Sequence, residues 1–172
     1  MDELLVVLRR RHRGWPVERT TAHRVEPLLP AEELLCGIRG NHVGGHPLAQ
    51  WASLLAGLYR SALLANDAVL VPERRCARGD LVHRIDVWTE QHVPQHRHGV
   101  ALHTETLGSV IDHIAAAQVR ADDALMACAS AGDPRVHAAW HRLAELVDGY
   151  NDLTTQVVRG VRRLPVPAGE DW

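Results

Sequence analysis

Four prolines divide this chain into segments that each begin with the features of a helix start. They stand in the first turn, where proline's missing N–H costs no hydrogen bond and its fixed φ angle suits a helix. These residues are Pro30, Pro47, Pro72 and Pro134. Asp133 precedes the last of them and is a natural N-cap. The pattern predicts a short helix, ended by Gly40, and four long ones, over about 30–39, 46–66, 72–92, 101–129 and 133–163.

Apolar residues recur with helical spacing along the last segment. They share one face and comprise Val136, Ala139, Trp140, Leu143, Val147, Tyr150, Leu153, Val157 and Val161. The connections "DAVLV", "PQHRHGV" and "AGD" are short, which favours antiparallel neighbours. We therefore expect an all-α fold, an up-down four-helix bundle with a short extra N-terminal helix. Trp51, Trp88 and Trp140 are expected to pack in its core.

The length of 172 residues suits a single domain. Residues 1–27 carry an arginine cluster and little periodicity, so we expect a poorly ordered leader. The helical-bundle domain is predicted over 28–164, and a tail over 165–172.

Composition excludes several broad classes of function. The formal net charge is only −2, so no global field draws the chain to nucleic acid or to an anionic membrane. No apolar run approaches the roughly 20 residues that span a bilayer, and "MDELLVVLRRRHR" lacks the order of a secretory signal. Cys36, Cys76 and Cys128 are far apart and form no C-x-x-C motif. A soluble protein of the reducing cytoplasm is expected, without nucleic-acid or membrane partners.

The histidines do not form a convincing metal site. His92, His96 and His98 lie around a predicted connection, with no carboxylate or thiolate interleaved at ligand spacing. His42 and His46 are equally weak candidates, and His46 is expected to cap the helix that Pro47 opens. We therefore predict no metal and no cofactor.

The last helix carries a second histidine pattern, in which His137, His141 and Glu145 are spaced four residues apart. The H-E-x-x-H form of a zinc protease is absent. His141 and Glu145 project opposite the apolar stripe together with Asp148 and Asp152, which favours a solvated or intersubunit face. No E-x-x-H sequence occurs, which argues against a di-iron bundle. Hydrolase-elbow, phosphate-loop and dinucleotide motifs are also missing.

One histidine invites a catalytic interpretation. On a helix over 101–129, His103 projects into an apolar face, whereas Glu105 and Asp112 project to the far side. A lone histidine on an apolar face is usually a hydrogen-bonded core or helix-end residue. The alternative is a general acid or base at the mouth of the bundle. Both interpretations stay open.

Three aspartates raise a separate possibility. Asp86 projects away from its apolar neighbours, as do Asp80 and His83, which predicts surface polar groups. Yet Asp86, Asp112 and Asp148 each lie in a different long helix and are flanked by apolar residues, in "RIDVW", "VIDHI" and "LVDGY". They are either solvated or converge at one end of the bundle or at a subunit contact.

Four motifs resemble one bacterial family over about 27–164. They are "GGHPLAQWA", "LVHRIDVW", "LHTETLGSVIDHIA" and "AWHRLAELVDGYNDL". The chain is similar to the uncharacterised helical family known as domain-of-unknown-function family 4254, in its actinobacterial form. The resemblance carries no assigned reaction and marks as shared polar positions His46, Asp86, His103, Glu105, Asp112, Asp148 and Asn151.

Two hypotheses about function follow. In the first, the bundle handles a small molecule in a biosynthetic pathway, as a cofactor-independent acid/base enzyme. His103 would be its proton donor or acceptor, oriented by Glu105 or Asp112, and the substrate-binding residues would be Asp86, Asp148 and Asn151. In the second, the chain is a non-catalytic homo-oligomeric or partner-binding module with polar outer helix faces as its interface.

Overall fold

The computed structural model describes residues 28–41, 45–65, 71–93, 99–128, 130 and 132–165. The predicted leader over 1–27, almost all of the predicted tail, and His42, His96 and His98 lie outside these ranges.

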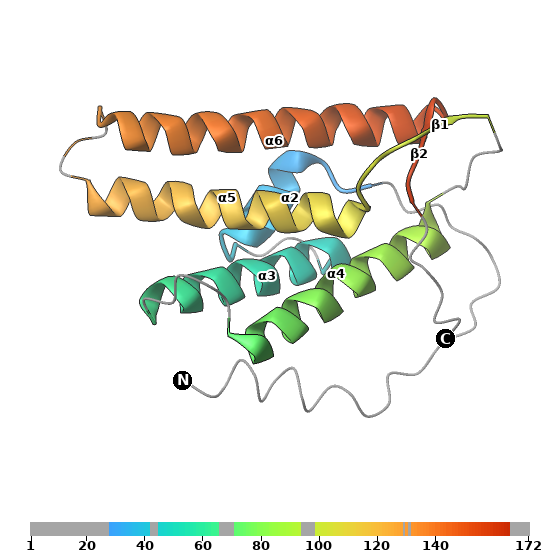
Figure 1. The fold of residues 1–172 in the computed structure, drawn as a ribbon. Coiled ribbons are helices and arrows are strands. Elements are labelled where there is room, and N and C mark those ends of the chain that lie inside the picture. The colour runs from blue at the N-terminus through green and yellow to red at the C-terminus, as the bar shows by residue number, and fades with distance from the viewer. Residues whose placement is uncertain are drawn as a thin grey trace.

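The described chain is mostly helical, as predicted (Figure 1). The helices are α2 (Ala31–Ile38), α3 (Pro47–Leu64), α4 (Pro72–His92), α5 (Leu107–Ala127) and α6 (Pro134–Val158). Two short strands, β1 (Ala101–Leu102) and β2 (Arg162–Arg163), pair in parallel. The all-α prediction is confirmed, with this one strand pair as a small addition.

The predicted helix starts are confirmed in detail at two caps. His46 accepts a hydrogen bond from the Leu48 N–H through Nδ1 at 3.2 Å, and Pro47 opens α3. The Asp133 carboxylate accepts one from the Arg135 N–H at 2.8 Å, and Pro134 opens α6. Each side chain satisfies a backbone donor that has no partner within its helix.

The predicted start of the third long helix, over 101–129, is wrong by several residues. The helix begins at Leu107, where the Thr106 hydroxyl accepts a hydrogen bond from the Ser109 N–H at 3.2 Å. Residues 101–102 are extended instead and pair with β2, and the His103 N–H donates to the Arg163 carbonyl at 2.9 Å. His103 therefore lies before the helix and not on its apolar face.

The predicted end of the last helix is also too late, because α6 stops at Val158. Gly160 follows with a φ angle of 72°, a left-handed conformation that glycine adopts without steric cost. Its N–H donates to the Val157 carbonyl, and the Val161 N–H donates to the Gln156 carbonyl, both at 3.0 Å. This pair of bonds is a Schellman motif, which turns the chain out of the helix and into β2.

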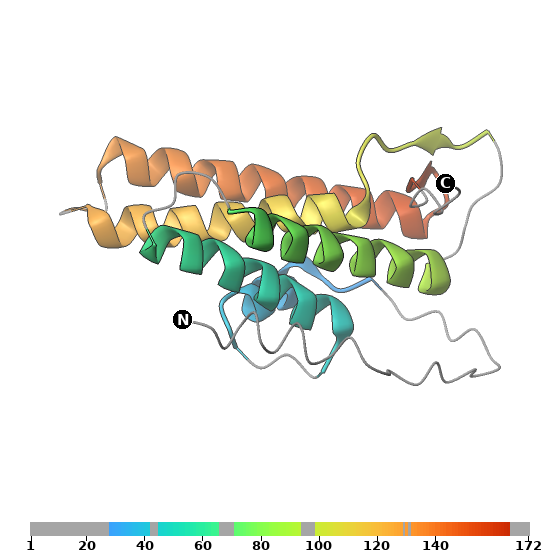
Figure 2. The ribbon, with the colours of Figure 1, turned by 60° about the horizontal axis from the view of Figure 1, so that its bottom comes forward.

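Helix α5 lies at the centre of the fold and packs against α2, α3, α4 and α6. In Figures 1 and 2 it lies between α6 on one side and α3 with α4 on the other. Helix α6 packs on α5, α2 and β2, whereas α4 packs on α3 and α5. The pairings of a square four-helix bundle are therefore not confirmed, since α6 has no extensive contact with α3 or α4.

The core consists of aliphatic and aromatic side chains from all five helices. Trp88 is buried, and Trp51 and Trp140 pack against the core, as predicted. Tyr150 of α6 is completely buried, and its hydroxyl donates to the Leu29 carbonyl at 2.7 Å. Burial raises the pKa of Tyr150, so this donor keeps its proton and links α6 to the segment before α2.

No helix in the described ranges is both long and apolar enough to cross a lipid bilayer.

Replacing Tyr150 with Phe should lower the free energy of unfolding by about 1–2 kcal/mol, because it leaves the buried Leu29 carbonyl without its donor. Denaturant titration measures the change. Asn151→Ala, an exposed change on the same helix, is the control and should stay within about 0.5 kcal/mol of the parent. A Tyr150→Phe variant as stable as its parent would contradict this assignment.

Candidate functional site

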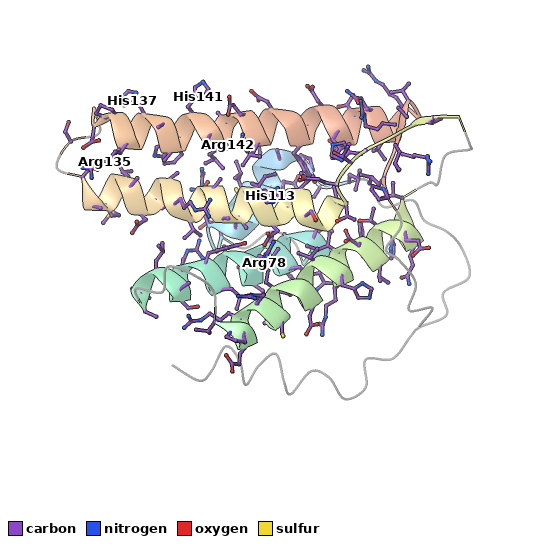
Figure 3. All side chains as sticks on the ribbon, viewed as in Figure 1. Arg78, His113, Arg135, His137, His141 and Arg142 are labelled. Atoms are coloured by element: carbon purple, nitrogen blue, oxygen red, sulfur yellow. The ribbon has the colours of Figure 1, made fainter. Side chains whose placement is uncertain are left out.

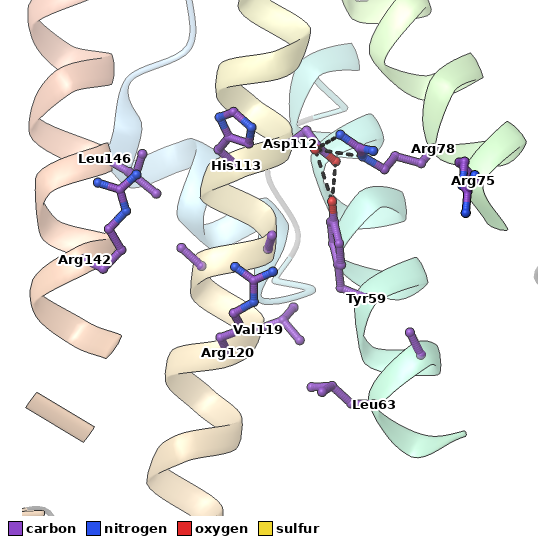
Figure 4. Close-up of a pocket in the computed structure, with 13 residues that line it drawn as sticks. Tyr59, Leu63, Arg75, Arg78, Asp112, His113, Val119, Arg120, Arg142 and Leu146 are labelled. Atoms are coloured by element: carbon purple, nitrogen blue, oxygen red, sulfur yellow. Dashed lines mark hydrogen bonds and ion pairs between the residues drawn. The ribbon is translucent and has the colours of Figure 1, made fainter. Parts of the chain in front are cut away.

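A cavity of about 570 Å³ opens between the two sides of the fold (Figure 4). Helices α3 and α4 line one side and α6 lines the other, through Tyr59, Leu63, Arg75, Arg78, Arg142 and Leu146. The central helix α5 contributes Asp112, His113, Ala116, Ala117, Val119 and Arg120. The volume falls in the range of small-molecule sites. The cavity exists because α6 and α4 both pack on α5 without extensive contact with each other.

The floor of the cavity holds a buried carboxylate. The Asp112 side chain is 1% exposed, and Arg78 of α4 reaches its Oδ2 atom through Nε and Nη2, both at 2.9 Å. The Tyr59 hydroxyl, from α3, lies 3.0 Å from Oδ1 and 3.1 Å from Oδ2. A buried charge is costly unless it is paired and hydrogen-bonded, and here both conditions are met. We call Tyr59, Arg78 and Asp112 the floor cluster.

Protonation states in the floor cluster follow from its geometry. Burial, together with the neighbouring Asp112 charge, raises the pKa of Tyr59 to about 12. Burial alone would lower the pKa of Arg78, but Asp112 and Tyr59 together raise it. At neutral pH the phenol is therefore a donor and the guanidinium is charged. Neither group is set up to exchange a proton near neutral pH.

A second buried aspartate fixes the start of α5, one helical turn before Asp112. Asp86 of α4 is 7% exposed, and its Oδ1 accepts a hydrogen bond from the Gly108 N–H at 2.7 Å. Negative charge at a helix N-terminus satisfies a free N–H and interacts favourably with the helix dipole. Burial raises the pKa of Asp86, although the bond from Gly108 opposes the shift. Asp86 therefore holds α4 against the first turn of α5.

The remaining polar groups around the cavity are mostly cationic. Arg75, Arg120 and Arg142 are exposed at its edge, and His113 is half exposed. Asp112 is the one carboxylate among the described lining residues. In this site the Asp112 charge is paired with Arg78, and the other charged lining residues are arginines, so the lining has an excess of positive charge.

The predicted catalytic residues do not meet in one place. The Nδ1 atom of His103 lies 2.9 Å from the backbone carbonyl of Glu105, outside the cavity. The Glu105 carboxylate lies 3.5 Å from Nδ1 of His113, with both side chains half exposed. Asp112 bonds to Tyr59 and Arg78 instead. Among the described residues, the His103 ring therefore bonds to the backbone of Glu105 and to neither predicted carboxylate.

Two predictions about the aspartates are wrong. Asp86 was expected at the surface and Asp112 on the far side of its helix, yet both are buried. Projection onto one apolar stripe fails here because α5 is covered by helices on several sides. Asp86 and Asp112 each bond across the α4–α5 contact, to Gly108 and Arg78 respectively, whereas Asp148 and Asn151 are exposed on α6 and do not line the cavity.

The outer face of α6 is exposed in the single chain, which fits both the solvated and the intersubunit alternative. Figure 3 shows His137 and His141 on the side of α6 that faces away from α5. The His141 Nδ1 atom lies 3.6 Å from Glu145, and both side chains are well exposed.

The one described member of the other histidine pattern, His92, lies at the other end of the fold, where its ring stacks on Trp88 with 4.6 Å between centroids. Within the described ranges, no three His, Cys, Asp or Glu residues are placed to hold a metal ion.

Sequence reasoning missed Tyr59 and Arg78, the partners of Asp112, and it did not single out His113 or the other three cavity arginines. Tyr59 lies four residues after Leu55 and three before Ala62, a spacing that puts it on an apolar helix face, where a phenol is ordinarily a packing residue. Arg78 offered a usable signal, because it precedes Leu81 by three residues and Ile85 by seven. That spacing puts an arginine on the buried side of α4, where it needs an acidic partner.

Comparison with known proteins gives one match. The family described as "Protein of unknown function (DUF4254)" matches residues 73–166, more than half of the chain. The matched range contains α5, α6, both strands and nearly all of α4. No curated protein and no solved structure matches the chain.

Glycine-to-alanine changes at Gly108 and Gly149 should have opposite effects on stability, because Gly108 is in close contact with α4 and Gly149 is not crowded. A Cβ at Gly108 would lie 2.5 Å from the Val82 carbonyl oxygen and 2.7 Å from Asp86 Oδ1, so Gly108→Ala should destabilise the fold by about 1–3 kcal/mol. A Cβ at Gly149 meets nothing within 4 Å, so Gly149→Ala should stabilise α6 by about 0.5–1 kcal/mol. Thermal and denaturant unfolding measure both. Stabilisation by Gly108→Ala would show that α4 and α5 are not in this close contact.

Proposed function

The chain belongs to the DUF4254 family, and we propose that it binds a small anionic molecule in the cavity between α6 and the α3–α4 pair. The observation that carries the proposal is the charge of the lining. Four arginines and one aspartate leave a formal charge of +3 before His113 is counted. Guanidinium groups bind phosphate and carboxylate through paired hydrogen bonds.

The floor cluster supports this proposal by its rigidity. Three helices contribute one residue each, so the floor is set before a ligand arrives. A preorganised site loses less conformational entropy when it binds. In this proposal Asp112 and Tyr59 position Arg78 and take no part in proton transfer.

The acid/base hypothesis has a different imidazole available to it. His113 lines the cavity and has the Glu105 carboxylate 3.5 Å from Nδ1. A carboxylate on one ring nitrogen orients the ring and leaves the other nitrogen for a ligand. The role proposed for His103 instead requires a substrate near β1, where its Nδ1 meets the Glu105 carbonyl. The substrate-binding roles proposed for Asp86, Asp148 and Asn151 gain no support from the cavity.

The non-catalytic alternative has one favourable observation. Helix α6 presents an outer face with exposed His137, His141, Glu145 and Asp148, which is free to form a polar contact between copies of the chain. Under either hypothesis we propose that the chain is cytoplasmic, in keeping with the free and exposed thiols of Cys36 and Cys76.

A fluorescence titration with anilinonaphthalene sulfonate, a sulfonate with an apolar body, tests anion binding. We expect one saturable site from which inorganic phosphate displaces the dye at constant ionic strength. Arg120→Gln should weaken dye binding about tenfold, because it removes a charged hydrogen-bond donor from the cavity.

Arg159→Gln is the matched control, since Arg159 is exposed at the end of α6 and does not line the cavity. It should leave dye affinity unchanged. Dye binding that resists phosphate and is equal in both variants would exclude the cavity as an anion site.

A further inference from the structure

The arginines of the cavity differ in how far their charge is already neutralised. Arg78 forms an ion pair with Asp112, with 2.9 Å between Nη2 and Oδ2. Arg75 and Arg120 form no ion pair with any residue in the described part of the chain. Arg142 lies 3.4 Å from Glu145, but both side chains are more than half exposed, and such pairs are weak in water. Three arginine charges are thus left for a ligand.

These three arginines come from three different helices. Arg75 lies on α4, Arg120 on the central α5 and Arg142 on α6. Figure 4 shows Arg142 on one wall, Arg75 on the opposite wall and Arg120 between them. Because α4 and α6 have no extensive contact, the positive charge is spread across the opening and not concentrated at one point. A ligand with one phosphoryl group can contact fewer of these guanidinium groups than a ligand with two.

The cavity also has an apolar part. Leu63 of α3, Val119 of α5 and Leu146 of α6 line it along with the small side chains of α5. Leu63 is 43% exposed, so its side chain is accessible to a ligand in the cavity. A ligand that fits this lining has an anionic end and an apolar body.

We propose that the ligand is a small diphosphate-bearing molecule whose two phosphoryl groups bridge Arg75 and Arg142 over Arg120, with an apolar body against Leu63 and Leu146. This proposal rests on the anion site proposed above and names its substrate class. A diphosphate monoester carries about three negative charges at neutral pH, which matches three available guanidinium groups, each suited to phosphate oxygens. The bridge also joins α6 to α4, which the protein alone does not do extensively.

Isothermal titration with inorganic pyrophosphate, inorganic phosphate, a short-chain alkyl diphosphate and the matching alkyl monophosphate tests the proposal at constant ionic strength. Both diphosphates should bind at least tenfold more tightly than their monophosphate counterparts, and the alkyl diphosphate more tightly than pyrophosphate. Equal affinity of mono- and diphosphates would overturn the diphosphate assignment and leave the anion site standing. Binding of none of the four, with a dye that phosphate does not displace, would overturn both proposals.

Variants locate the two ends of the bridge. Arg75→Gln and Arg142→Gln should each lower diphosphate affinity about tenfold and change phosphate affinity by less than threefold, whereas Arg159→Gln should change neither. Diphosphate selectivity that persists in both cavity variants would overturn the bridge. Both arginines are exposed, and circular dichroism checks that each variant is folded.

Hydrogen exchange on the unaltered protein gives a second readout that needs no variant. Pyrophosphate should slow amide exchange in both α4 and α6, because it ties together two helices that have no extensive contact with each other. Inorganic phosphate at the same fractional saturation should not slow exchange in α6. Protection confined to α5 with pyrophosphate would contradict bridging.

Discussion

The Asp112 carboxylate is the group around which the rest of this structure is arranged. It is buried at the centre of the fold, and it is kept there by a guanidinium from α4 and a phenol from α3. A buried charge without such partners would cost several kcal/mol, so the burial of Asp112 depends on Arg78 and Tyr59. Because each comes from a different helix, the same contacts that satisfy the charge fix α3 and α4 against α5. The floor of the cavity therefore consists of the same three residues that neutralise and hydrogen-bond the buried Asp112 carboxylate.

Helix α5 can occupy the centre because its sequence allows close approach on several sides. Gly108 meets the α4 backbone at Val82, and Ala115, Ala116 and Ala117 are all buried in the middle of the helix. Asp86 then fixes the start of α5 by accepting its Gly108 N–H. With α6 on one side of this helix and α3 and α4 on the other, a space is left above the small side chains. Arginines from three helices line that space, so the lining carries positive charge although the whole chain carries a net charge of only −2.

Much of the helical framework was predictable, because proline and cap residues act through local geometry. His46 and Asp133 cap the expected helices, and the DUF4254 resemblance is confirmed. The start of α5 was not predictable in the same way, since 101–102 take an extended form through pairing with 162–163, which lie 61 residues later in the sequence. The burial of Asp112 depends likewise on α3 and α4, which a projection of α5 alone does not contain. The position of Arg78 on the apolar side of α4 could have predicted a buried acidic partner.

A double-mutant cycle between Arg78 and Asp112 tests the central claim most directly, with Arg78→Gln, Asp112→Asn and the double variant compared by denaturant unfolding. The Arg78 side chain is 38% exposed, which screens the pair, so we expect a coupling free energy of about 1–3 kcal/mol. Each single change should then cost nearly as much as both together, because either one leaves its partner without a counter-charge. Additive costs, with a coupling free energy near zero, would contradict the claim that this ion pair organises the helices and the cavity between them.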